Sequence, residues 1–160
     1  MKNTVRILIA GDFCPIGRTQ KAILDGKSSD MVRDIKPIIN SSVISVVNLE
    51  TPLSLEGEPI EKTGPNIQSD PRCIDFLNKS GFSLVNTANN HILDFGEESY
   101  SQTIELLDKN NLKHVGSGAN IILAVREKIF IVLGKKIAFI AYAENEYTVA
   151  SRNSAGAAPV

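Results

Sequence analysis

The sequence predicts an α/β domain whose central sheet is mostly parallel. Three observations support this fold class. Short β-branched apolar runs recur along the chain, and segments whose apolar residues have helical spacing lie between the early runs. Two further apolar runs near the end of the chain are separated by a short turn, as in a β-hairpin. The chain has 160 residues, of which 42% are hydrophobic, so it can bury one globular core. We expect one domain over residues 1–150 and a loose tail over residues 151–160, where Ala, Ser and Gly dominate.

The first predicted strand covers residues 5–10, because a run of Val, Ile and Leu ends there at the turn residues Gly11-Asp12. Residues 30–40 have apolar side chains at helical spacing and predict a helix, although Pro37 removes one helical hydrogen bond. A second buried strand is predicted over residues 43–47. Both strands are followed at once by polar side chains.

A long loop and a capped helix follow the second strand. Residues 54–69 are rich in Gly, Pro and Glu and have no period, which is typical of a functional loop. Asp70-Pro71 then supplies a helix cap with proline in the first turn, and Gly81 ends that helix. The third strand is predicted over residues 82–86.

The last part of the domain is predicted to alternate between helix and strand and then to end in a hairpin. The turn of the hairpin is expected at Gly134-Lys135-Lys136, between two apolar runs. In chain order, the predicted elements are a helix over 97–110, a short strand over 113–115, a short helix over 121–125, and the hairpin strands 129–133 and 137–142.

Composition excludes several functional classes. Basic and acidic residues number 17 and 18, so the chain has no net positive charge with which to bind nucleic acid or an anionic membrane. The two cysteines, Cys14 and Cys73, do not make a disulfide framework in a chain of this length. We find no signal peptide and no apolar run long enough to span a membrane, and therefore expect a cytoplasmic protein.

Potential ligand side chains follow each of the first three predicted strands. Asp12 follows the first strand, Asn48 and Glu50 follow the second, and the segment Ala88-Asn89-Asn90-His91-Ile92-Leu93-Asp94 follows the third. The carboxyl ends of parallel strands meet at one edge of a sheet, so these side chains are expected to converge. Carboxylate and amide oxygens with one imidazole suit Mg²⁺, Mn²⁺ or Zn²⁺.

Asp94 allows two interpretations. It lies three residues after His91, so on a helical segment it would stand beside the imidazole and orient it. Asp94 and Glu97 are also three residues apart and match a capping box, which is a purely structural device. The sequence does not decide between them.

The motifs at these strand ends resemble those of the bacterial capsule-synthesis CapA family. The resemblance rests on Gly11-Asp12, on Asn48-Leu49-Glu50-Thr51-Pro52 and on the segment from Ala88 to Gly96, and two later segments, 115–120 and 134–139, are also similar. The family is itself similar to calcineurin-like metallophosphoesterases. The resemblance therefore implies an α/β/β/α sandwich, of which this chain would supply one half.

The resemblance also implies roles for individual residues. Asp12, Glu50 and Asn90 would be metal ligands, and His91 would donate a proton to the leaving group. The implied function is a divalent-metal-dependent phosphoesterase-like or hydrolase-like activity in the biosynthesis of capsular poly-γ-glutamate, acting on a small-molecule or polymer substrate.

Two departures from the metallophosphoesterase pattern support other interpretations. Cys14 stands where such enzymes often have a histidine, and after His91 the chain contains only His114, which fits no ligand motif. A non-catalytic accessory or binding module with a degenerate metal site is therefore an alternative, and a metal-free small-molecule binder is a third. One half of a sandwich would expose the inner face of its sheet. We therefore expect this face to be covered either by a second copy of the chain in a homo-oligomer or by a carboxyl-terminal half that is missing from this chain.

Overall fold

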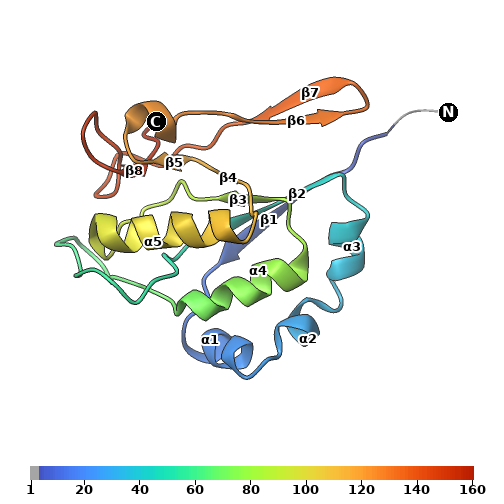
Figure 1. Cartoon of the computed structure of the whole chain (residues 1–160), viewed down its shortest axis with the longest axis horizontal. Coiled ribbons are helices and arrows are strands. Elements are labelled where there is room, and N and C mark those ends of the chain that lie inside the picture. Colours follow the sequence, from blue (N-terminus) through green and yellow to red (C-terminus); the bar gives the residue numbers. More distant parts are fainter. Residues whose placement is uncertain (1–3) are drawn as a thin grey trace.

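A central sheet of four parallel strands organises the chain, as seen in a computed structural model that describes residues 4–160 (Figure 1). The strands are β1 (Ile7–Phe13), β2 (Ile44–Leu49), β3 (Leu84–Asn86) and β4 (His114–Val115), and they stand in the sheet in the order in which they occur along the chain. The predicted α/β class with a mostly parallel sheet is confirmed.

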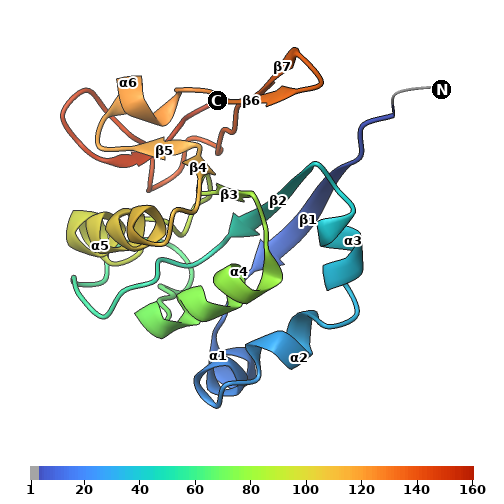
Figure 2. The ribbon, with the colours of Figure 1, turned by 45° about the vertical axis from the view of Figure 1, so that its right-hand side comes forward.

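One face of the sheet is covered by helices (Figures 1 and 2). Strand β2 alternates, so that Val47 and Leu49 point to this face and pack against Leu77 and Leu107 of the helices. The chain supplies α1 (Gly17–Leu24), α2 (Ser28–Val32), α3 (Lys36–Asn40), the 3₁₀ turn η1 (Pro71–Cys73), α4 (Ile74–Ser80) and α5 (Gly96–Lys109).

The other face of the sheet packs against a hairpin made of β6 (Lys128–Val132) and β7 (Lys135–Phe139). Ile44, Val46 and Leu84 of the sheet lie in one apolar cluster with Val132 and with Phe130 and Phe139 of the hairpin. The predicted hairpin is confirmed, but its turn is Leu133-Gly134, one residue earlier than expected. Both turn residues have a positive φ, 51° and 75°, which is typical of a two-residue hairpin turn.

Two helical predictions need correction. The helix expected over 30–40 is two short helices, α2 and α3, because Pro37 lies in the first turn of α3, where its missing N–H costs nothing. Helix α1 was not expected. Its residues provide no side chain that caps its start and only one fully buried apolar residue, Ile23, so the usual signals are missing.

The segment 151–160 differs from the loose tail that was predicted. Strand β8 (Gly156–Ala157) pairs antiparallel with β5 (Ser117–Gly118), next to the short helix α6 (Ile121–Ala124). Ala157 and Ala158 are completely buried. Small residues allow this close packing, since a Cβ on Gly156 would stand 2.5 Å from the backbone nitrogen of Ala150. The segment therefore belongs to the domain.

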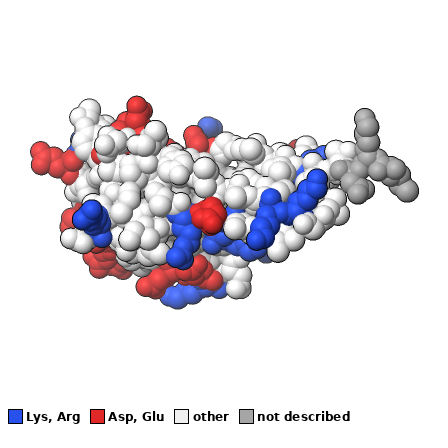
Figure 3. Space-filling view, turned by 90° about the horizontal axis from the view of Figure 1, so that it is seen from above, with Lys and Arg blue, Asp and Glu red and all other residues white. Residues whose placement is uncertain are grey.

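Several large apolar side chains remain exposed on the side of the molecule that carries the hairpin. Ile9 and Ile131 are 74% and 75% exposed, and Ile140 is 60% exposed. Seen from above, most of the visible surface belongs to residues other than Lys, Arg, Asp and Glu (Figure 3). The two-sheet sandwich implied by the family resemblance remains a prediction. Over residues 4–160, no helix is both long and apolar enough to cross a bilayer.

Candidate functional site

The carboxyl ends of β1, β2 and β3 place their polar residues side by side. Asp12 lies opposite Asn48, and Asn48 lies opposite Asn86. Between Ile9 and Asp12 the register of β1 shifts against β2, as in a β-bulge. Such bulges redirect side chains next to functional sites, and here the shift brings Asp12 into line with Asn48. The predicted convergence of the first two strand ends is confirmed.

Asn48 is the centre of the polar network at this edge. Its amide nitrogen donates to Asp12 Oδ1 at 2.8 Å and to Glu50 Oε2 at 2.5 Å. Its carbonyl oxygen accepts from the amide nitrogen of Asn86 at 2.8 Å and from that of Asn89 at 3.3 Å. One amide group thus holds two carboxylates together and is itself fixed by two asparagines.

Burial and the neighbouring charges affect the acidity of this site. Burial raises the pKa of Glu50, and the nearby Asp12 carboxylate raises it further, whereas the hydrogen bond from Asn48 acts in the opposite direction. Burial likewise raises the pKa of the Cys14 thiol, and Glu50 and Asp12 add to the rise. The ionised form of Glu50 is therefore disfavoured in the free chain, and a bound cation would stabilise it.

His91 lies next to these carboxylates and is held from behind by Asp94. The His91 Nδ1 atom is 2.6 Å from Asp94 Oδ2, and its Nε2 atom is 3.9 Å from Glu50 Oε1. Asp94 is fully buried, while the His91 side chain keeps 16% of its surface exposed. Helix α5 begins without a side-chain cap, so of the two interpretations of Asp94 the structure supports the orienting one.

Asn89 and Asn90 differ in their orientation. Asn89 is buried, and its amide nitrogen donates to the Leu49 carbonyl at 2.8 Å. Asn90 is exposed, and no hydrogen bond within residues 4–160 joins its side chain to Asp12 or Glu50. Asn90 as a metal ligand remains a prediction, whereas Asn89 has a structural role that sequence reasoning did not assign.

Lys62, in the loop over residues 54–69, is a site residue that sequence reasoning missed. Its side chain is only 3% exposed and forms an ion pair with Asp94. Its Nζ atom also lies 3.2 Å from His91 Nδ1 and 3.4 Å from the backbone oxygen of Asn90. A lysine in a polar loop is normally solvated, so no signal in the sequence marked this one.

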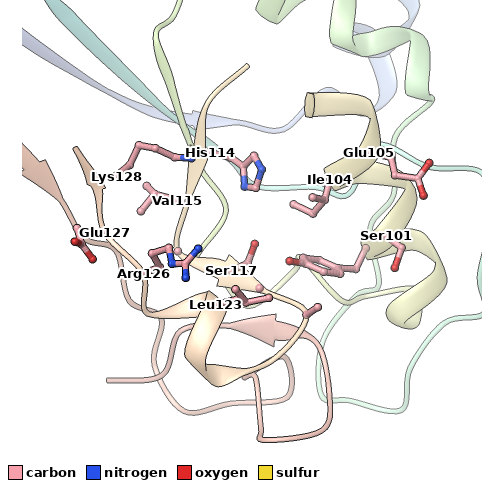
Figure 4. A pocket seen from close by; sticks show the side chains of 14 residues that line it. Ser101, Ile104, Glu105, His114, Val115, Ser117, Leu123, Arg126, Glu127 and Lys128 are labelled. Carbon is pink, nitrogen blue, oxygen red and sulfur yellow. The ribbon is translucent and has the colours of Figure 1, made fainter. Parts of the chain in front are cut away.

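A separate pocket of about 420 Å³ lies between α5, β4, β5 and α6 (Figure 4). Ile104 and Leu123 form part of its apolar wall, and His114 and Arg126 also line it. None of the sequence-predicted site residues lines this pocket. His114 Nε2 lies 3.2 Å from Asp108 Oδ1, to which it can donate, and burial lowers the pKa of His114.

Comparison with known proteins identifies the family. The family described as "Bacterial capsule synthesis protein PGA_cap" matches residues 6–159 of this chain. The chain belongs to the PGA_cap family. The expected resemblance to CapA proteins is thereby confirmed over almost the whole chain, including the segment that had been expected to be a loose tail.

Individual relatives of the PGA_cap chain are more distant and considerably longer. The capsule biosynthesis protein CapA of Bacillus anthracis is 30% identical over 116 residues, which are 70% of this chain and 28% of that protein. The PGA biosynthesis protein CapA of Bacillus subtilis (strain 168) is 26% identical over 105 residues, which are 64% of this chain and 28% of that protein. A probable polyglutamine synthesis accessory protein of Mycobacterium tuberculosis is 30% identical over 91 residues, which are 57% of this chain and 24% of that protein. The chain thus spans about a quarter of each relative.

The ligand atoms at this edge of the PGA_cap chain, carboxylate oxygens and one imidazole nitrogen, are of the kinds that bind divalent cations. Asp12 and Glu50 offer carboxylate oxygens at one place, and His91 presents a ring nitrogen toward Glu50. In the part of the chain that the structure describes, however, no three His, Cys, Asp or Glu side chains are grouped closely enough to enclose a metal ion. A cation bound here would therefore need further ligands, such as amide oxygens, water or substrate.

Proposed function

We propose that this chain is part of a protein of capsule or poly-γ-glutamate biosynthesis that carries a divalent-metal-dependent, phosphoesterase-like or hydrolase-like site at the carboxyl edge of its sheet. The observation that carries the proposal is the pair of carboxylates, Asp12 and Glu50, held by Asn48 beside the His91 imidazole. The relatives named for capsule and PGA biosynthesis support the process.

The proposed residues have distinct tasks. Asp12, Glu50 and Asn90 would hold Mn²⁺, Mg²⁺ or Zn²⁺, whose chemistry when bound is to acidify a water molecule and to neutralise charge on the substrate. His91 would move a proton through Nε2, since this nitrogen faces Glu50 while Nδ1 is bound to Asp94. Asp94 would keep the ring in this orientation.

Calorimetric titration with Mn²⁺ tests the metal proposal. We expect binding by the wild-type chain and weaker binding by Asp12→Ala and by Asn90→Ala. Asp30→Ala is a suitable control, because Asp30 is an exposed carboxylate on α2 that pairs only with nearby Arg33 among the described residues. Equal affinity of the wild-type chain and both site variants would contradict the proposal.

A non-catalytic accessory or binding module is the second candidate. It is favoured by the lack of a group of three His, Cys, Asp or Glu ligands in residues 4–160, and one relative is named as a probable accessory protein. Hydrolysis of a generic phosphodiester distinguishes the two. Turnover by the full-length protein that is lost in His91→Ala would exclude the accessory role, and a lack of turnover despite metal binding would favour it.

A further inference from the structure

The pocket between α5, β4, β5 and α6 is a second concave site on the chain. Its volume of about 420 Å³ lies within the range of small-molecule binding sites. Ile104 of α5, Val115 of β4 and Leu123 of α6 contribute apolar side chains to its walls (Figure 4). Neither Asp12 nor Glu50 lines it, so a ligand here would bind apart from the polar edge of the sheet.

The hydroxyl group that Ser117 brings to the pocket is already engaged within the protein. The Thr87 hydroxyl donates to the Val115 carbonyl at 3.1 Å, so its oxygen accepts the proton of the Ser117 hydroxyl at 2.6 Å. A ligand therefore finds no free hydroxyl proton at Ser117. Apolar contact and the charges around the pocket are left to decide what binds.

Two cations, Arg126 and Lys128, line the pocket where the chain leaves α6 and enters β6. Lys128 is half-buried, whereas Arg126 is exposed, and Figure 4 shows Arg126 near Ser117. Glu127 between them is exposed. Because neighbouring residues of an extended chain point to opposite sides, Glu127 does not share the side of Lys128.

The charges around the pocket favour an anion. Of the two acids that line it, Glu105 already has a basic partner, since Lys109 Nζ lies 3.1 Å from its Oε2 atom. Over residues 4–160, no ion pair joins Arg126 or Lys128 to an acid. A guanidinium binds a carboxylate through two parallel hydrogen bonds, which gives both strength and orientation.

We propose that this pocket binds a small organic carboxylate with an apolar body. Arg126 and Lys128 hold the carboxylate at the rim, and Ile104 and Leu123 contact the apolar body. The proposal concerns a second site and requires neither metal binding nor hydrolysis at the first, so it stands or falls apart from the proposed function.

Three probes with the same apolar body test the proposal: phenylbutyrate, phenylbutanol and phenylbutylamine. Each is titrated into the 160-residue chain while the backbone amide NMR spectrum is recorded. We expect phenylbutyrate to bind at about millimolar concentration, as a fragment of this size does, and phenylbutanol to bind more weakly. Phenylbutylamine should bind least. The amide signals that shift should be those of the pocket, such as residues 115–119 and 123.

Variants separate the charge from the apolar wall. Arg126→Met should weaken phenylbutyrate binding by about fivefold, which is the upper range for an exposed ion pair, and should leave phenylbutanol binding unchanged. Leu123→Ala should weaken both probes alike, because both lose the same apolar contact. Arg33→Met removes an exposed guanidinium from α2 and should change neither affinity.

The phenylbutanol titration also shows whether the pocket survives in each variant, so a misfolded variant is not mistaken for a loss of charge. Equal affinity of the wild-type chain for the three probes would overturn the proposal. So would a lack of binding at millimolar concentration, shifts confined to amides outside the pocket, or an unchanged preference for phenylbutyrate over phenylbutanol in Arg126→Met.

Discussion

Asn48 is the residue on which the geometry of the two carboxylates depends. Replacing it with leucine removes both N–H donors while keeping a side chain of similar size, so Asp12 and Glu50 lose their shared partner. A hydrogen bond to a charged group contributes about 1.5–3 kcal/mol to stability. We expect Asn48→Leu to lower the free energy of unfolding by about that amount, measured by urea denaturation at neutral pH without added metal.

An exposed asparagine provides the control for this prediction. Asn78 donates to Asn110 at 2.8 Å on the surface of α4, where water can replace the lost bond. Asn78→Leu is therefore expected to change the free energy of unfolding by less than about 0.5 kcal/mol. Equal losses in the two variants would show that the contacts of Asn48 to the carboxylates contribute no special stability.

His114 predicts a dependence of stability on acidity. Burial lowers its pKa, and Lys128 acts in the same direction, although Asp108 opposes them. Between this lowered pKa and the ordinary histidine value, the unfolded chain binds more protons than the folded chain, so stability falls as the pH falls. His114→Gln should flatten this part of the curve in urea denaturation at a series of pH values. If the unfolding free energy of His114→Gln fell with pH as steeply as that of the wild-type chain, His114 would not be the source of this dependence.

At the level of single residues, the sequence predicted the polar strand ends correctly because topology determines them. Asp12 lies at the carboxyl end of β1 and Glu50 directly follows β2, and parallel strands bring their carboxyl ends to the same edge of a sheet. Lys62 could not be predicted, because its burial depends on how a loop without periodicity folds back onto Asp94. Nor could the sequence tell which of Asn89 and Asn90 points inward.

The loop over residues 54–69 is an element whose position depends on one glycine. Gly57 has a φ of +86°, and a Cβ there would stand 1.9 Å from the backbone oxygen of Phe95, at the start of α5. Gly57→Ala therefore combines backbone strain of about 1–2 kcal/mol with overpacking of about 1–3 kcal/mol. We expect a loss of unfolding free energy in this combined range, measured by urea denaturation.

Gly64 on the same loop separates the two contributions. Its φ is +94°, but a Cβ would meet nothing within 4 Å. Gly64→Ala should therefore show only the backbone strain of about 1–2 kcal/mol. If the two variants were equally destabilised, the close approach of the loop to Phe95 would not contribute.

Secondary structure was predictable where a local signal was strong. Gly81 ends α4 with a φ of +85°, and Leu133-Gly134 turns the hairpin, so turn chemistry marked both places within a residue or so. Helix α1 has no such signal and was missed. The pairing of β8 with β5 joins residues about 40 positions apart through very short strands, which no local pattern could indicate.

At the scale of the whole molecule, the β6–β7 hairpin has an apolar outer side that no other part of the described chain covers. Along β6, Phe130 and Val132 pack onto the sheet, while Ile129 and Ile131, which alternate with them, are 45% and 75% exposed. A strand that is apolar on both faces is typical of a strand buried on both faces. The relatives are also much longer, since the matched part of the chain covers only 28% of each of the two CapA proteins.

We therefore expect the 160-residue chain to associate with a second copy through the outer side of the hairpin, because burial of apolar surface there gives about 25 cal/mol for each Å² removed from water. Sedimentation velocity should show a dimer or larger species whose proportion rises with concentration. Ile131→Lys places a charge in this surface and should shift the population toward monomer while the far-ultraviolet circular dichroism spectrum stays unchanged.

Leu55 provides the matched control for this last prediction. It is an exposed apolar residue, 70% accessible, on the loop over residues 54–69, where its backbone N–H donates to the Gln102 side chain of α5, and Leu55→Lys introduces the same charge there. If the hairpin is the contact surface, only Ile131→Lys should dissociate the assembly. A wild-type chain that sediments as a stable monomer at all concentrations would mean that the outer side of the hairpin needs no cover in this chain.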